Sequence, residues 1–206
     1  MEPSRARRVL AIPEALERPL PKPRRDLVGY ASARTLEALV EGILALKFLE
    51  RGFTRNAAGK AFQAWRALTA AILALERDKI AEKMRSEEQR KWLTEKALPR
   101  VPSSRLKVLG RLVEEAGYTD YSHYTSTALD LHDYQYHGPD PDAELSKYPD
   151  PGEAARDTIS ILGKLAGIVE NRVKPKLEEE NMWSREHEEA LQKLRGTLKT
   201  ISQRAA

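Results

Sequence analysis

The chain has 206 residues, no cysteine and a net charge of +4, with 35 Lys and Arg against 31 Asp and Glu. The missing cysteine excludes disulfides, thiolate metal sites and cysteine nucleophiles, and no apolar run reaches the roughly 18 residues of a membrane span. Its mean hydropathy of −0.58 is typical of a soluble protein. We expect a cytoplasmic protein, since no secretion signal is apparent. Abundant Lys, Arg and Glu with scarce Asn point to a thermophile.

Residues 1–30 are predicted to form an extended, basic, proline-rich arm. Five prolines lie between Pro3 and Pro23, a density that breaks any continuous helix. Residues 1–26 carry seven Lys and Arg against four Asp and Glu, a net charge of +3. The arm is therefore either a strap that packs on the rest of the chain or a basic segment that contacts phosphate.

Residues 31–206 are predicted to form one all-α domain, an antiparallel helical bundle with a core over about 31–174 and a C-terminal helical extension over 175–206. No segment alternates as a strand would. Apolar spacing, caps and stop signals predict helices in this order: 32–51, 55–84, 86–98, 104–116, 120–137, 151–174 and 184–198. The strongest start signal is Asp150-Pro-Gly-Glu153, and Pro175 is expected to kink or interrupt its helix.

Histidines gather in the helix predicted over 120–137. Residues three or four apart share a helix face, so His132 pairs with Tyr136 and Asp133 with His137. A histidine beside carboxylates can act as a general base. His132 and His137 are five residues apart, however, which is poor spacing for a metal site on one helix, and we predict none. The alternative is that these rings simply pack in the core.

The predicted hairpin around Gly52 carries basic side chains next to aromatic ones. Two interpretations stay open for it. The aromatic residues Phe62 and Trp65 and the nearby cations form a nucleotide-binding surface, or the aromatic rings face the core while the cations face solvent. The cations in question are Arg51, Arg55, Lys60 and Arg66.

The segments Gly52–Leu68 and Leu131–Gly138 resemble the PaREP family of archaeal proteins, which is similar to a branch of the HEPN superfamily. The resemblance covers roughly residues 31–173. It implies a bundle of four or five core helices that forms homodimers. Many HEPN proteins are metal-independent ribonucleases whose signature is an Arg, then four to six intervening residues, then a His. Other branches serve as accessory subunits beside nucleotidyltransferases.

The resemblance carries the signature histidine to His132. The positions that would hold the signature arginine contain Thr125, Ser126 and Thr127. We therefore expect a non-catalytic accessory protein that binds a nucleotide, RNA or a partner protein such as a nucleotidyltransferase, without a cofactor. The predicted ligand-binding residues are His137, Asp133, Tyr136 and Arg172.

Two other hypotheses remain at this stage. In the first, the chain is a ribonuclease in which His132 works with an arginine from the following helix, Arg172 or Arg156. In the second, the basic arm of residues 1–26 binds nucleic acid.

Overall fold

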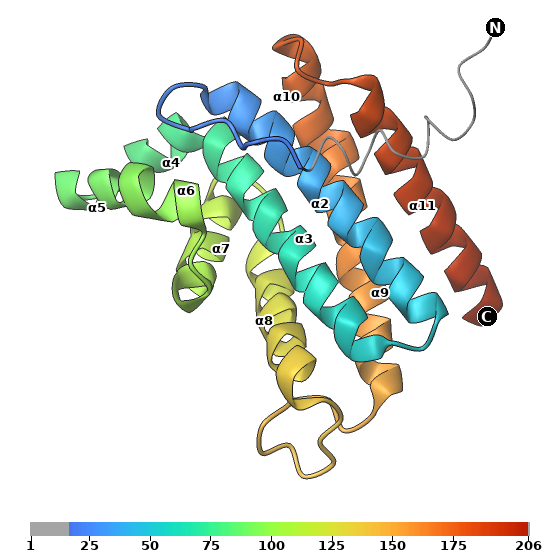
Figure 1. Ribbon diagram of the computed structural model, residues 1–206. Coiled ribbons are helices and arrows are strands. Elements are labelled where there is room, and N and C mark those ends of the chain that lie inside the picture. Colours follow the sequence, from blue (N-terminus) through green and yellow to red (C-terminus); the bar gives the residue numbers. More distant parts are fainter. Residues whose placement is uncertain (1–16, 206) are drawn as a thin grey trace, which may run out of the picture.

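A computed structural model describes residues 17–205 of the chain, and these residues are helical and contain no strand (Figure 1). The prediction of an all-α bundle is confirmed. The α-helices are α2 Leu27–Glu50, α3 Thr54–Leu75, α4 Arg77–Glu82, α5 Glu87–Trp92, α6 Leu98–Arg100, α7 Leu106–Glu115, α8 Tyr121–His137, α9 Pro151–Ile168, α10 Lys174–Glu179 and α11 Arg185–Ala205. π-Helical turns span Leu93–Ala97 and Val169–Val173, and a 3₁₀ turn spans Ser103–Arg105. None of the described helices is long and apolar enough to cross a membrane.

The antiparallel hairpin of α2 and α3 is the centre of the bundle. Helix α3 packs on α2 along its length and also contacts α8 and α9, while α11 covers the outer side of α2. Figure 1 shows α4 to α7 on the side of α3 that is opposite α11. The four short helices therefore form a separate edge of the molecule, next to the central hairpin.

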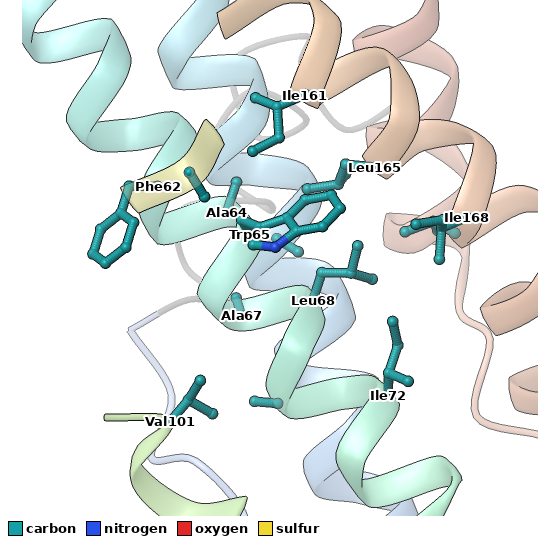
Figure 2. Packing of buried hydrophobic residues seen from close by; sticks show 14 of the residues in the cluster. Phe62, Ala64, Trp65, Ala67, Leu68, Ile72, Val101, Ile161, Leu165 and Ile168 are labelled. Carbon is teal, nitrogen blue, oxygen red and sulfur yellow. The ribbon is translucent and has the colours of Figure 1, made fainter. Parts of the chain in front are cut away.

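Small residues allow α3 to lie close to its neighbours. Alanines recur along its buried face, and Phe62 and Trp65 fill the space beside them, each at most 1% exposed. Figure 2 shows Trp65 directed toward Ile161 and Leu165 of α9, while Phe62 points to another side of α3. The two aromatic rings are therefore core residues, as one of the two interpretations of this hairpin predicted.

Helix α2 begins at Leu27, five residues before the predicted start at residue 32. The side chain of Asp26 accepts a hydrogen bond from the backbone N of Gly29 at 2.7 Å, which caps the helix. The cap was missed because it directly follows the prolines of the predicted arm. Residues 1–16 of that arm lie outside the described part of the chain, and residues 17–26 contain turns.

The prediction of one helix over residues 55–84 is wrong. Helix α3 ends at Leu75, and Glu76 separates it from α4. The carboxylate of Glu76 is 5% exposed and accepts a hydrogen bond from the Tyr118 hydroxyl at 2.8 Å. It also pairs with Lys176 at 3.1 Å. These distant partners hold Glu76 in place where the helix breaks, and local apolar spacing does not reveal them.

Two further helix ends follow their sequence signals. Asp150 accepts hydrogen bonds from the backbone N of Gly152 and Glu153, at 2.6 and 3.1 Å, and caps α9. Gly138 ends α8 with a φ of 76°, which favours glycine. Pro175 is accommodated by the π-helical turn that precedes α10, because proline has no N–H to donate. Other predicted bounds are wrong: the helix predicted over 184–198 continues to Ala205, and a π-helical turn interrupts the helix predicted over 86–98.

Candidate functional site

His132 lies where α8 packs on α3. Its ring stacks on the Phe62 ring with centroids 4.0 Å apart and planes 18° apart, and the Tyr136 ring meets it edge-on at 5.2 Å. The Nδ1 atom is buried and has no hydrogen-bond partner among the described residues. Burial lowers the pKa of His132 from its usual range, with a smaller lowering by Arg66 and an opposing contribution from Asp133. The imidazole is therefore neutral near pH 7.

Arg66 is the arginine whose charge acts on His132, yet its guanidinium is already engaged. Its Nε and Nη2 atoms donate to the carbonyl oxygens of Val101 and Arg100 at 3.2 and 3.1 Å. Its Nη1 atom donates to Oε1 of Gln63 at 3.2 Å. These bonds hold the turn after α6 against α3, so Arg66 has a structural task in this arrangement.

The structure does not bring Arg172 or Arg156 to His132 within one chain. Arg172 donates to the carbonyl of Gly117 at 2.9 Å, and its guanidinium lies 4.6 Å from the ring centre of Tyr118. Gly117 and Tyr118, the two partners of Arg172, precede α8. His132 lies about 16 Å from the start of that helix, at a rise of about 1.5 Å per residue. Arg156 pairs with a glutamate in the first turn of α9, at 3.8 Å.

The other predicted ligand-binding residues lie on the outer side of α8. Tyr136 is 60% exposed, and Asp133 and His137 are also exposed. The predicted pairing of His132 with Tyr136 is therefore present as a ring contact. Asp133 and His137 have no hydrogen bond to each other in the described chain, so their predicted roles depend on a ligand.

A groove of about 490 Å³ lies between α3 and α8, close to the His132 turn. The side chains that line it are cationic or carry amides, and no carboxylate is among them. The lining residues are Arg55, Asn56, Gly59, Lys60, Gln63 and Gln135. We call this the α3–α8 groove. Amides offer both hydrogen-bond donors and acceptors, and cations attract anions, so the groove suits a ligand with polar edges and a negative charge.

Gly59 allows the Gln135 side chain to lie against α3. A Cβ atom at position 59 would come within 2.3 Å of Oε1 of Gln135. Only an indirect signal of this groove is visible in the sequence: Asn56, Lys60 and Gln63 recur at helical spacing on one face. The contribution of Gln135 depends on how α8 packs on α3, which the spacing within one helix cannot reveal.

The two cations of the groove are both anchored. Arg55 donates from Nε to the carbonyl of Gln135 at 3.1 Å and from Nη2 to the carbonyl of Tyr136, which caps the end of α8. Lys60 pairs with Glu41 of α2 at 2.8 Å. Anchoring fixes both charges at the edges of the groove. It also partly neutralises Lys60, so Arg55 supplies the stronger positive field.

Among the described residues, no three His, Asp or Glu side chains lie close enough together to hold a metal ion.

This arrangement places the chain among all-α bundle proteins with a polar surface groove between two packed helices. The chain belongs to the archaeal PaREP1/PaREP8 family, whose model matches residues 33–159, more than half of the sequence. The family expected from the sequence is thus confirmed. The matched range contains both sides of the α3–α8 groove and His132, but ends before Arg172. No curated protein matches the chain, and no solved structure does.

Proposed function

We propose that this chain is a non-catalytic accessory protein that binds a phosphate-bearing nucleotide in the α3–α8 groove. The observation that carries the proposal is the composition of the groove, which has two cations, three amides and no carboxylate. Phosphate oxygens pair with Arg and Lys, and base edges pair with amides. A volume of about 490 Å³ lies within the usual range for small-ligand sites.

Tyr136 supports this assignment because it is an exposed aromatic ring at the same end of α8. At 60% exposure the ring is accessible to a base, while its perpendicular contact with His132 holds it in position. Base stacking on an aromatic ring accepts every base, so the site would favour nucleotides over simple phosphate. Asp133, about one turn before this ring, and His137, the next residue, would then set the rim of the site.

The ribonuclease alternative has less support. Catalysis by His132 needs a cation that stabilises developing charge on the phosphate. Arg66, the arginine whose charge reaches His132, donates from all three of its side-chain nitrogens to neighbouring groups. An arginine from a second copy would have to complete such a site. We also propose, from the resemblance, that the accessory protein has a HEPN-like fold and forms a homodimer.

Calorimetric titration with ATP, AMP and inorganic phosphate tests the proposed site. The double variant Asn56→Ala/Gln63→Ala removes two exposed or half-exposed amides and keeps the helix, since alanine is a good helix former. We expect ATP and AMP to bind the wild type at least tenfold more tightly than this variant. The matched control, Gln192→Ala/Gln203→Ala on α11, should bind as the wild type does.

Two results would contradict the proposal. One is equal nucleotide affinity in the groove variant and the α11 control. The other is metal-free cleavage of a labelled mixed-sequence RNA by the wild type that is lost in His132→Ala, which would establish the ribonuclease alternative.

A further inference from the structure

The segment from Arg77 to Arg111 holds the positive charge of the molecule. It contains eleven Lys and Arg against five Asp and Glu, a net charge of +6, whereas the whole chain carries +4. The rest of the chain is therefore slightly negative. Figure 1 shows this segment, α4 to α7, as a distinct edge of the bundle on the far side of α3 from α11. We call it the basic edge.

Most of the cations on the basic edge are exposed. Lys79 and Lys83 donate to the carbonyl oxygens of Ala116 and Glu115, and the side chains of the other exposed cations make no hydrogen bond within the described residues. Nine of the eleven are exposed, and none of these nine forms a salt bridge within the described part of the chain. Only Arg77 and Arg90 are paired, each with a carboxylate nearby in sequence. The nine are Lys79, Lys83, Arg85, Lys91, Lys96, Arg100, Arg105, Lys107 and Arg111.

A groove of about 560 Å³ crosses the basic edge between α5 and α7. The half-buried Trp92 and Val108, which is 40% exposed, give it an apolar wall. The exposed side chains of Arg85 and Arg105 line the same groove. Glu115 is the one carboxylate among the lining residues. A groove that is lined by an aromatic ring and by arginines can hold a flat, polar ring next to a phosphate.

We infer that the basic edge binds single-stranded nucleic acid, with one base in the groove beside Trp92 and the phosphates on the surrounding Lys and Arg side chains. Unpaired bases stack on aromatic rings, and the backbone follows cations at successive positions. Six of the nine exposed cations on the basic edge do not line the groove. An acidic peptide seated in the groove would leave those unused, whereas a polymer with a charge on every unit engages them.

This inference does not rest on the nucleotide site proposed above, because the two grooves share no residue. The test is fluorescence anisotropy with a labelled 12-nucleotide single-stranded RNA of mixed sequence, at several NaCl concentrations. The variant is Arg85→Ala/Arg105→Ala. The control is Lys193→Ala/Lys199→Ala, which removes the same charge from exposed positions on α11.

The expected result is a change in how strongly RNA affinity depends on salt concentration. Each phosphate contact to a single strand contributes about 0.7 to the slope of log affinity against log salt. The Arg85/Arg105 variant should therefore lose about 1.4 from the slope, while the control keeps the wild-type slope. Trp92→Leu should weaken binding by about tenfold through lost stacking, and Trp92→Phe should restore most of it.

Three outcomes separate the possibilities. Equal affinity and slope in the arginine variant and the α11 control would overturn the inference. So would the absence of RNA binding together with binding of a Glu-rich amphipathic helical peptide, because the groove would then be a protein-docking site. Asn56→Ala/Gln63→Ala should leave the RNA slope unchanged, so failure of the nucleotide site and failure of the basic edge are distinguishable.

Discussion

The contact between Gly59 and Gln135 links a single residue to the proposed ligand site. An added methyl at position 59 would come within 2.6 Å of the Gln135 amide carbon, so the flexible amide must move out of the groove. Gly59→Ala should therefore weaken nucleotide binding. Alanine is favoured over glycine in a helix by about 1 kcal/mol, and this gain offsets the cost of displacing the Gln135 amide. The free energy of unfolding should therefore change little.

Gly163→Ala is the matched control for that substitution. Gly163 lies within α9, and a Cβ atom there meets nothing within 4 Å. We expect this variant to stabilise the fold by up to about 1 kcal/mol and to leave nucleotide binding unchanged. Denaturant unfolding and calorimetric titration of both variants check the pair. Unchanged binding in Gly59→Ala would show that the Gln135 amide is not part of the site.

His187 makes the stability of the fold depend on pH. Its Nε2–H donates to the carbonyl of Ser32 at 2.9 Å, so Nδ1 is the acceptor and takes a hydrogen bond from the Ser184 hydroxyl at 2.9 Å. Burial lowers the pKa of His187, while the Ser32 bond and Glu186 oppose the shift. Protonation would remove the Nδ1 acceptor and place a charge in a buried site.

The sign of the pH effect follows from this lowered pKa. The unfolded chain, with a His pKa near 6.5, takes up the proton first. The stabilisation is complete above that pH and is lost as pH falls, by at most about 1.4 kcal/mol per pH unit for one group. Urea unfolding between pH 7.5 and 5.5 should show falling stability, with a shallower slope in His187→Gln. A stability that rises toward pH 5.5 would refute this assignment.

At the scale of the helices, Asp150 shows how much one cap contributes. Its carboxylate accepts two backbone hydrogen bonds at the start of α9. Asp150→Ala should lower the free energy of unfolding by about 1 kcal/mol. Asp142→Ala, in the same loop and at an exposed position, should change it by less than about 0.5 kcal/mol. Equal losses in the two variants, measured by denaturant unfolding, would contradict the capping role.

The correctly predicted helix ends depend on local chemistry, whereas the missed break at Glu76 depends on distant contacts. The Asp26 cap is local, but it directly follows the prolines of the predicted arm and was missed. The Asp150-Pro-Gly-Glu signal, Gly138 and the pairing of His132 with Tyr136 all act within one helix. The break at Glu76 depends on Tyr118 and Lys176, which follow 42 and 100 residues later. The α3–α8 groove was missed for the same reason, since amides on two helices form one surface only after packing.

At the scale of the whole molecule, Trp65 connects the central hairpin with the helices around it. Its ring stacks on Tyr121 at 4.5 Å, and its Nε1–H donates to the Thr125 hydroxyl at 3.0 Å, both in α8. Trp65→Ala should cost about 3 to 5 kcal/mol of stability. Trp92→Ala, a half-buried ring on the basic edge, should cost clearly less. Thermal unfolding compares the two, and equal losses would show that the basic edge is as important for stability as the hairpin.

The two proposed binding surfaces differ in their charge and in the side chains that they present. The α3–α8 groove is an amide-lined site with anchored cations, and the basic edge carries nine exposed Lys and Arg side chains that form no salt bridge within the described residues. Both lie against α3, which is the helix that contacts most of the fold. Binding at either surface should therefore raise the unfolding temperature of the whole domain.

The most direct test of the nucleotide site follows the side-chain amide NMR signals of the chain while AMP is added. We expect saturable shifts for Asn56, Gln63 and Gln135, and constant positions for Gln192 and Gln203 on α11. No shift in the three groove amides at millimolar AMP, or equal shifts in all five, would contradict the claim that the α3–α8 groove binds a nucleotide.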